Sequence, residues 1–480
     1  MPRMKPGFKK SLIVLIVISI VLFVVLNLTQ EYFENAEIMP VPGWLVIPFA
    51  LLLGSIALAP FINRHWWEHN YPKVSYTLGI IVVLYYILIL HNVPRLLLTF
   101  SEYISFIMLV GSLFVVSGGI HVKIRGKSAP YENVILLAVG AVIANLLGTT
   151  GASMLLIRPY LRINKFRVKP YHVVFFIFIV SNVGGALTPI GDPPLFLGYL
   201  KGVPFFWVIG RLWHIWALAI GVLLLIFFII DTISFRKESA RLQKEAMVPD
   251  EPEVSGLHNL IYLAIILGAV FISHPVMLRE VIMAGAAFAS YYTTQTHVHG
   301  KNEFNFIPIQ EVAILFIGIF ATMIPALDWL ELNASSLGIV TPGQYFWGTG
   351  ALSSFLDNAP TYLNFLSAAF GLHGASVDNL MHMDAMLGIA TPHALGLANP
   401  LSASAFPITA DSWRYIQAIS VGAVFFGACT YIGNAPNFMV KSISEQSKVE
   451  CPSFLGYIAK YTLPILIPVF TAIWFIYFRG

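Results

Sequence analysis

Charged residues are scarce in this 480-residue sequence, because Asp, Glu, Lys and Arg together account for 11% of it and hydrophobic residues for 57%. A soluble domain carries about a quarter charged residues, so the composition excludes a soluble globular protein. The mean hydropathy of +0.77 and the many apolar runs indicate a polytopic membrane protein. The net charge of +4 comes from short basic loops between these runs, which does not favour nucleic acid as a partner.

Cysteine and clustered metal ligands are also scarce. The sequence has only two cysteines, Cys429 and Cys451, so we expect no disulfide framework. No cluster of Cys and His accompanies the polar residues of the apolar runs, which disfavours a transition-metal site, and we expect no cofactor. The apolar runs also lack a Ser/His pair, a paired-Asp arrangement and a His/Glu metal motif, which disfavours an intramembrane enzyme.

Apolar runs long enough to cross about 30 Å of hydrocarbon occur throughout the chain. The first run could be a signal peptide, but its length and the lack of a clear small-residue cleavage site favour a retained helix. The polar segment 232–256 is predicted to be a cytoplasmic linker. The apolar runs lie near residues 11–29, 44–61, 75–93, 103–120, 132–157, 171–200, 205–231, 257–275, 279–293, 307–327, 343–370, 413–440 and 454–478.

The loop charges predict the orientation of these segments, because Lys and Arg accumulate on the cytoplasmic side of a membrane. The N-terminus is basic and is therefore predicted to be cytoplasmic, and the loop 93–102 is predicted to be external. The loops 121–130 and 158–170 are both basic and are therefore both predicted to be cytoplasmic. The segment 132–157 between them must then enter and leave the membrane from the inside, as a re-entrant hairpin.

A second hairpin follows from the absence of basic residues in the second half. No Lys or Arg occurs between Lys301 and Arg414, so the segments between the flanking helices are predicted to be external. The run 343–370 then starts and ends outside and forms a hairpin of the opposite orientation. The loop 371–412 is predicted to be external, and the C-terminus also ends outside.

A Gly- and Pro-rich stretch with one carboxylate, Asp192, interrupts the apolar run 171–200. It reads Gly184-Gly-Ala-Leu-Thr-Pro-Ile-Gly-Asp-Pro-Pro-Leu195. Broken backbone at membrane depth is tolerated only inside the protein or along a watery cavity. With a shift of 242 positions, residues 427–438 align with 185–196 at seven identical positions of twelve. Matching interruptions in the two halves of a chain are typical of a transporter's binding site.

These features predict an all-α polytopic membrane protein with about eleven transmembrane helices, two oppositely oriented re-entrant hairpins and an inverted-topology repeat. An odd number of spans in each repeat forces the inversion. The predicted boundaries are 1–43 for an N-terminal helix and external loop, 44–231 for the first repeat (hairpin 132–157, broken helix 171–200), 232–256 for the linker, and 257–480 for the second repeat (hairpin 343–370, broken helix 413–440).

The two hairpin tips and the two helix breaks are expected to meet near the middle of the membrane, where broken helices offer free carbonyl and N–H groups. The side chains there carry hard oxygen ligands, which suit Na⁺ or a similar ion. For any single Asn, Thr or Ser, the alternative is a plain hydrogen bond between helices. The predicted ion- or substrate-binding residues are Asn145, Thr149, Thr150, Ser181, Asn182, Thr188, Gly191, Asp192, Asp357, Asn358, Thr361, Thr430, Gly433, Asn434 and Asn437.

Asp192 and Asp357 are the candidates for proton coupling, because a carboxylate at membrane depth is costly and is functional by default. The alternative is that each lies near an interface and caps the N-terminus of a half-helix. Asp192 aligns with Asn434 and Asp357 with Gly148, so each half supplies one titratable group. A buried carboxylate can exchange a proton for Na⁺, which provides a mechanism for sodium/proton exchange.

On these residues the chain resembles the ion transporter superfamily, which includes divalent anion/sodium symporters, citrate transporters, arsenite permeases and NhaD-type sodium/proton antiporters. The stretch from Gly184 to Asp192 and the tip Leu356-Asp-Asn-Ala-Pro-Thr361 are similar to the NhaD-type pattern, whereas the dicarboxylate branch carries Ser-Asn-Thr at its tips. The resemblance covers nearly the whole chain. It implies a homodimer in which a transport domain moves against a scaffold domain like an elevator.

The sequence therefore predicts a secondary active transporter of a bacterial-type inner membrane. The first hypothesis is a sodium/proton antiporter. The alternative is a sodium-coupled citrate or dicarboxylate transporter, which would use the same Na⁺ sites and hold the carboxylates with half-helix N-termini and Thr or Asn side chains. The expected partners are a small ion or small organic anion and the lipid bilayer. A passive channel is disfavoured, because duplicated closed sites fit alternating access better than a continuous pore.

Overall fold

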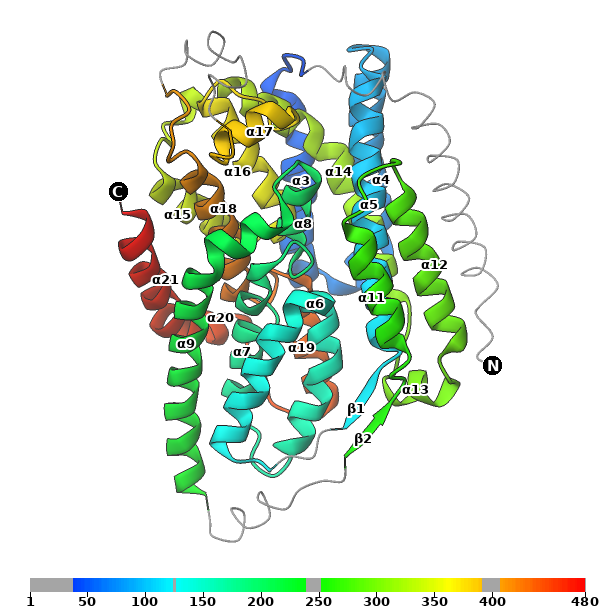
Figure 1. Ribbon diagram of the computed structural model, residues 1–480, viewed down its shortest axis with the longest axis vertical. Helices are drawn as coiled ribbons and strands as arrows, with labels where there is room; N and C mark the ends of the chain where they lie inside the picture. The colour runs from blue at the N-terminus through cyan, green and yellow to red at the C-terminus, as the bar shows by residue number, and fades with distance from the viewer. Residues whose placement is uncertain (1–37, 124–126, 239–251, 391–405, 480) are drawn as a thin grey trace.

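The computed structural model describes residues 38–123, 127–238, 252–390 and 406–479, and most of these residues are helical (Figure 1). The helix predicted near 11–29 lies outside the described residues. Parts of the predicted linker and of the loop before the helix at 413 also lie outside them.

The first half of the described chain forms helices and one short strand. Five of the helices, α3 and α5 to α8, have a proline in their first turn, where its fixed φ suits the helix and its missing N–H costs nothing. In chain order the elements are η1 (Gly43–Val46), α3 (Ile47–Ile62), α4 (Arg64–Leu88), α5 (Val93–Gly118), β1 (His121–Lys123), α6 (Pro130–Ile163), α7 (Pro170–Ile179), η2 (Val183–Leu187), α8 (Pro193–Leu200) and α9 (Phe205–Lys237).

The second half also contains long helices, a helical pair and an interrupted helix. Its last segment is one continuous helical stretch in which α-helical and wider π-helical turns alternate. The elements are β2 (Glu253–Ser255), α11 (Asn259–Val270), α12 (Leu278–Thr293), α13 (Thr296–Lys301), α14 (Ile307–Asn333), η3 (Ala334–Leu337), α15 (Pro342–Ser353), α16 (Asn358–Leu372), α17 (Leu380–Met386), α18 (Trp413–Phe426), η4 (Gly427–Cys429), α19 (Ala435–Gln446), α20 (Phe454–Tyr457), η5 (Ile458–Leu466), α21 (Ile467–Ile473) and η6 (Trp474–Phe478).

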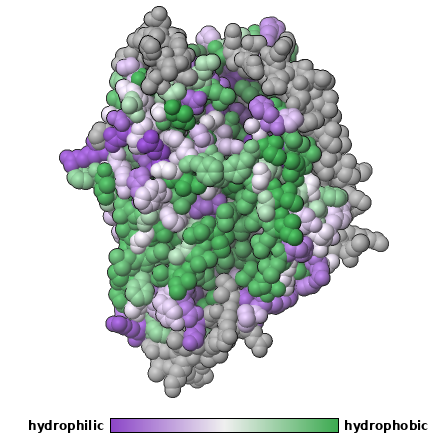
Figure 2. All heavy atoms as spheres, viewed as in Figure 1, coloured by the Kyte–Doolittle hydropathy of each residue, from purple (hydrophilic) through white to green (hydrophobic). Residues whose placement is uncertain are grey.

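Apolar side chains form a broad band across the middle of the molecule, with hydrophilic residues above and below it (Figure 2). Large hydrophobic residues stay exposed in this fold, among them Ile62 of α3, Leu225 of α9 and Leu463 of η5. Such a surface suits lipid rather than water. Within the described residues, eight helices are long and apolar enough to cross a membrane, which makes the chain a multi-pass membrane protein.

The helices pack as two groups. The frame group consists of α3, α4, α5, β1, β2, α11, α12, α13 and α14, in which α14 packs on α3, α4 and α5, and α12 packs on α5 and α11. The core group consists of α6 to α9, α15, α16 and α18 to η6, in which α6 packs on α9 and α19, and α16 packs on α8 and α18. The groups meet where α14 contacts α16 and where α5 contacts α6 and α8. Figure 1 shows α4, α5, α11 and α12 at the right and α9, α18 and α21 at the left.

Helix α6 consists of two legs that fold back on each other. Gly148 interrupts it with φ 72° and ψ 157°, a conformation that glycine adopts at little cost. A straight helix of this length would be about 50 Å long. Asn133 near its start and Asn164 after its end nevertheless exchange side-chain hydrogen bonds of 2.9 and 2.8 Å, and Figure 1 shows the two legs side by side. The chain therefore turns back where the hairpin was expected, and its insertion into a membrane from the inside stays a prediction.

Helices α15 and α16 form the second pair of legs. The Thr341 hydroxyl accepts from the Gln344 N–H at 3.3 Å and caps the start of α15. The two legs contact each other through aromatic packing, because the Tyr345 and Phe365 rings lie 6.1 Å apart edge to face. Residues 354–357 form the turn between the legs. This pair corresponds to the expected hairpin 343–370.

Several helices extend into segments that were predicted to be loops, and one of them, α6, ends at Ile163 inside the predicted loop 158–170. The expected external loop 93–102 is the first part of α5, because Pro94 and the Asn92 side chain, which accepts from the Arg95 N–H at 3.2 Å, start the helix early. Helix α9 continues past 231 into the predicted linker. There the polar residue Asp231 does not end the helix, since its carboxylate is buried and paired.

A small sheet also departs from an all-α fold. Strands β1 and β2 pair antiparallel, with His121 opposite Ser255 and Lys123 opposite Glu253. Each strand is only three residues long, which is too short to produce a recognisable alternation in the sequence. The sheet joins the end of α5 to the start of α11 within the frame group.

Candidate functional site

Both helix breaks have the same backbone shape, in agreement with the alignment of the two halves. Thr188 (φ −132°, ψ 154°) and Thr430 (φ −141°, ψ 169°) are both extended. Four residues later, Asp192 (φ −145°, ψ 144°) and Asn434 (φ −153°, ψ 141°) are extended as well. Equivalent positions therefore take equivalent conformations although one carries a carboxylate and the other an amide.

Glycines are required in both breaks because the backbone passes close to itself. A Cβ added to Gly191 would lie 2.1 Å from the carbonyl oxygen of Gly185, and a Cβ added to Gly433 would lie 2.6 Å from that of Gly427. The N–H groups of Gly191 and Gly433 each donate to the hydroxyl of the threonine three residues earlier, both at 3.1 Å. The predicted glycines thus shape the breaks through their backbone.

A threonine ties each break to the hairpin of its own half. The Thr188 hydroxyl donates to the carbonyl of Asn145 at 2.6 Å, and the Thr430 hydroxyl donates to the carbonyl of Ser354 at 2.5 Å. In the first half, the N–H of Thr149 also donates to the carbonyl of Gly191 at 2.8 Å. The structure therefore brings the tips and the breaks together.

The two halves meet at the Asp192 side chain, which is 1% exposed. Its Oδ1 accepts from the Thr149 hydroxyl at 2.6 Å and from the Asn434 side-chain amide at 3.1 Å. Its Oδ2 accepts from the side-chain amide of Asn358. In the part of the chain that the structure describes, no Lys, Arg or His forms an ion pair with this carboxylate. One carboxylate thus collects contacts from the first tip, the second tip and the second break.

Asp357 has a different environment. It is half-buried, and its Oδ1 accepts from the N–H of Ala359 at 3.0 Å, so that it caps the N-terminus of α16. The Thr361 hydroxyl donates to its backbone carbonyl at 2.9 Å. The capping alternative therefore describes the contacts of Asp357. Asp192 also precedes a helix, α8, but its side chain makes no cap.

Other predicted residues join the halves next to Asp192. The Asn182 amide donates to Asn437 Oδ1 at 2.7 Å, and Asn182 Oδ1 accepts from Asn434 at 3.2 Å. The Ser181 and Ser153 hydroxyls lie 2.8 Å apart. These are hydrogen bonds between helices, the plain structural alternative for such side chains. They hold the surroundings of Asp192 in place.

A small cavity of about 30 Å³ lies beside Asp192. Thr149 and Thr150 line it from the first tip, and Leu109 and Leu113 line it from α5 of the frame group. This volume corresponds to about one water molecule, whereas pockets for organic ligands measure about 300–1,000 Å³. In this conformation the space suits a bare cation rather than a citrate-sized anion.

The side-chain oxygen of Asn358, Oδ1, is buried without a hydrogen-bond partner among the described residues. An unpaired buried oxygen costs about 1–3 kcal/mol. Because the amide of the same side chain bonds to Asp192, this oxygen lies next to the carboxylate and is a further hard ligand for Na⁺.

A second buried group of charges, which we call the charge cluster, was not recognised from the sequence. It consists of Arg95 and Glu102 of α5, Asp328 of α14, Lys201 after α8 and Asp378 after α16. Arg95 pairs with Asp328 at 2.7 Å and with Asp378 at 2.5 Å, and Lys201 pairs with Asp378 at 2.5 Å and with Glu102 at 2.7 Å. The charge cluster joins the frame group to the core group. Arg95, Glu102 and Asp378 lie in segments that were predicted to be external loops, and nothing in that prediction brought them together.

Arg167 lies in the turn between α6 and α7, within the predicted cytoplasmic loop 158–170, but its side chain is buried. It is 5% exposed and forms a bidentate ion pair with Asp231 of α9, with one of the two bonds at 2.9 Å. The Tyr171 hydroxyl donates to the same carboxylate at 2.7 Å. The paired charge explains why both residues are accommodated in the interior.

Comparisons with known proteins agree with the resemblance inferred from the residues. Residues 38–478 match a family described as "Putative citrate transport". Similar proteins include an uncharacterized transporter of Mycobacterium bovis and one of Mycobacterium tuberculosis. Each is 24% identical to this chain over 344 residues, which cover 67% of this chain and 71% of the relative. Since the match spans nearly all of the described residues, the chain belongs to this citrate transporter-like family of membrane transporters.

Proposed function

We propose that this transporter exchanges Na⁺ for protons at Asp192 by alternating access. The supporting observation is a buried carboxylate without a basic partner among the described residues. A buried carboxylate requires a compensating positive charge or a proton. Na⁺ and a proton can each meet this requirement, and each excludes the other. This competition is the basis of exchange.

The remaining predicted residues support the same proposal. The Asn358 oxygen and the carbonyls of the two breaks would complete the coordination of Na⁺, and Asp357 is a second candidate for proton coupling. The division into a core group that holds the site and a frame group beside it supports an elevator-type movement. We further propose that the protein is a homodimer in a bacterial-type inner membrane and that its C-terminus is external. The proposed transport involves no enzymatic step.

The test uses purified protein in sealed proteoliposomes with an imposed proton gradient and a pH-sensitive dye inside. Addition of Na⁺ should collapse the gradient, and Li⁺ and K⁺ should define the ion selectivity. Asp192→Asn keeps the shape of the side chain but removes its charge, as in the equivalent residue Asn434. We expect this variant to insert and fold but to lose Na⁺-dependent proton flux.

Asp411→Asn is the matched control, because Asp411 is exposed and lies before the start of α18, outside both breaks. It should retain exchange at the wild-type rate. Proton flux that persists unchanged in Asp192→Asn would rule out this carboxylate as the exchanging group.

Sodium-coupled transport of citrate or a dicarboxylate is the second candidate, and the family description favours it. The same carboxylate would then bind the coupling Na⁺, and half-helix N-termini would hold the organic anion. Uptake of labelled citrate or succinate into the same proteoliposomes distinguishes the two. Saturable uptake driven by Na⁺, with no exchange in the absence of the anion, would establish the second candidate.

A further inference from the structure

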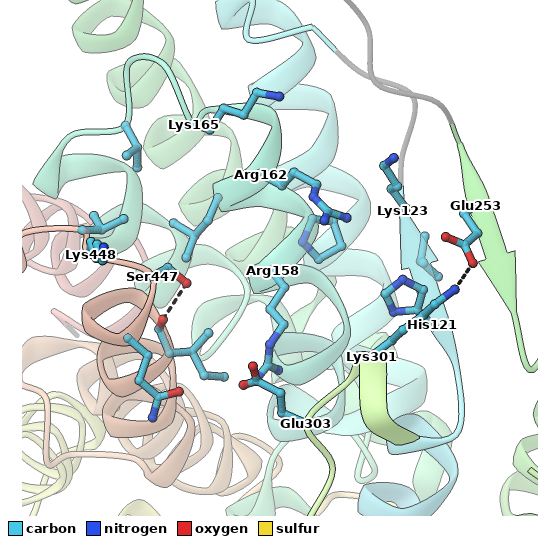
Figure 3. Close-up of a pocket in the computed structure, with 17 residues that line it drawn as sticks. His121, Lys123, Arg158, Arg162, Lys165, Glu253, Lys301, Glu303, Ser447 and Lys448 are labelled. Carbon is cyan, nitrogen blue, oxygen red and sulfur yellow. Dashed lines mark hydrogen bonds and ion pairs between the residues drawn. The ribbon is translucent and has the colours of Figure 1, made fainter. Parts of the chain in front are cut away.

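A large cavity lies on the side of the molecule that carries the basic segments, away from Asp192. Its volume of about 820 Å³ falls in the range of about 300–1,000 Å³ that is usual for small-molecule pockets. Its walls come from β1, the end of α6, β2, the end of α13 and the residues after α19 (Figure 3). Both the frame group and the core group therefore line it.

The lining of this cavity is strongly basic. It contains six Lys or Arg side chains and two carboxylates, which leaves an excess of four positive charges. Both carboxylates are already neutralised, because Glu303 pairs with Arg158 at 2.8 Å and Glu253 pairs with Lys301. The six basic residues are Lys123, Arg158, Arg162, Lys165, Lys301 and Lys448.

Three of these basic side chains form no direct ion pair, although Lys123 lies opposite Glu253 in the sheet and interacts with it at longer range. Lys123, Arg162 and Lys448 form no ion pair within the described ranges of the chain. Lys169, on the same face of the molecule, does pair, with Glu238 at 2.6 Å. Arg236 and Lys237, at the end of α9, also form no ion pair in the described part of the chain, in keeping with a general preference for basic residues on the cytoplasmic side. What distinguishes the cavity is that several unpaired basic side chains line one concave surface.

We propose that this cavity binds a small anion that carries two or more carboxylate or phosphate charges. Like charges that line a concave surface concentrate counter-ions there. Arg and Lys recognise carboxylate and phosphate through charge-assisted hydrogen bonds. A ligand with several negative charges would contact both helix groups at once and hold them in the present arrangement. The proposal is independent of which ion the protein transports, because this cavity shares no lining residue with the small cavity beside Asp192.

The same chemistry occurs on soluble anions and on the headgroups of acidic phospholipids. Nanodiscs distinguish these sources. If a soluble anion is the natural occupant, citrate should bind equally well in neutral lipid and in lipid that contains an acidic phospholipid. If a headgroup occupies the cavity, the acidic lipid should reduce the apparent affinity for citrate. Either result supports the anion site and identifies its occupant.

The primary experiment is a calorimetric titration of the full-length protein with citrate and with inorganic phosphate, at constant ionic strength set by chloride. The double variant Arg162→Gln/Lys448→Gln should bind both anions at least about tenfold more weakly, because two charged contacts are lost. Lys123→Gln alone should weaken binding in the same direction. Thermal unfolding of each variant verifies that it is folded.

Lys73→Gln is the matched control, since Lys73 is an exposed basic residue of α4 outside the cavity. It should leave the affinity unchanged. Equal affinity of the double variant and the wild type would overturn the proposal. Binding of chloride as tight as that of citrate would overturn it as well, because it would indicate general charge screening rather than a site for polyvalent anions.

Discussion

In the proposed exchange, the oxygens of Asp192 would hold Na⁺ only while the carboxylate is ionised, so the groups that donate to it would bias the competition between Na⁺ and the proton. The Thr149 hydroxyl donates to Oδ1 at 2.6 Å. A hydrogen bond to a charged acceptor is about twice as strong as one to a neutral acceptor. Loss of this bond therefore destabilises the ionised form more than the protonated form.

Thr149→Val should raise the Na⁺ concentration that gives half-maximal exchange by about tenfold, since hydrogen bonds to charged groups contribute about 1.5–3 kcal/mol. Dye-based exchange in proteoliposomes measures this concentration. The control is Thr322→Val, because Thr322 is buried in α14 and its hydroxyl bonds only to backbone carbonyls, of Gly318 at 2.8 Å and Ile319 at 3.3 Å. An identical shift in both variants would mean that the effect is a general loss of stability.

At the scale of residues, the sequence identifies the polar side chains but not their partners. Asp192 is conspicuous because it is a lone carboxylate in an apolar run. That Asn358 and Asn434 would bond to the same carboxylate could not be predicted, because these contacts join segments more than 160 positions apart. The unpaired Oδ1 of Asn358 is likewise a property of the packing.

At the scale of elements, each break depends on a glycine at which two backbone segments approach closely, Gly191 beside Gly185 and Gly433 beside Gly427. Gly191→Ala should destabilise the protein by at least about 1–3 kcal/mol, because the new methyl group would overlap a carbonyl oxygen that cannot move freely. Thermal unfolding of the purified variant and its Na⁺-dependent exchange report the effect.

The same substitution at Gly221 provides the control. A Cβ at Gly221, inside α9, meets nothing within 4 Å. Gly221→Ala should therefore be neutral or stabilise the helix by about 0.5–1 kcal/mol. If both variants unfold at the wild-type temperature, the close approach in the break is not a constraint on the fold.

Elements marked by loop charges or by a glycine-rich turn were predicted well. Elements whose boundaries depend on contacts with distant residues were not. The turn in α6 was expected from the charges of its flanking loops and from the Gly148-Thr-Thr-Gly151 sequence, and the chain does fold back there. The start of α5 was placed too late, because the charges of Arg95 and Glu102 resemble those of a loop. Only the partners in the charge cluster make these residues compatible with a buried helix.

At the scale of the whole molecule, the charge cluster holds the frame group and the core group together. Asp378→Asn would leave Arg95 and Lys201 short of negative charge in a buried site. Removing one partner of a buried pair costs about 3–5 kcal/mol, so the unfolding temperature should fall clearly. Asp384→Asn, on the neighbouring helix α17, is the control and should have little effect.

The effect of this substitution should depend on pH. Burial alone would raise the pKa of Asp378, but the charges of Arg95 and Lys201 outweigh it and hold the pKa below its usual value. The stabilisation is then complete above the ordinary pKa of about 3.9 and is lost as the pH falls below it. The difference in unfolding temperature between wild type and Asp378→Asn should stay constant from pH 8 to about 5 and narrow below about 4. A difference that narrows already near neutral pH would contradict this assignment.

The predicted topology places the linker 232–256 in the cytoplasm and the C-terminus outside. Alkaline phosphatase fused after Gly480 should be active, because this enzyme matures only outside the cytoplasm, whereas a fusion within the linker 239–251 should be inactive. Green fluorescent protein at the same positions should give the opposite pattern. The same activity at both positions would contradict the predicted arrangement.

The pairing of β1 with β2 has a consequence for how the chain is threaded. Lys123 and Glu253 lie directly opposite each other, so the polypeptide leaves the frame group and returns to it at one point. The helices α6 to α9 thus lie in a segment of the chain whose two ends are held together by this strand pair. The strand pair connects α5 to α11 directly within the frame group, so a displacement of α6 to α9 would not require the frame helices to move. In the proposed elevator movement, α6 to α9 would therefore move as one inserted unit.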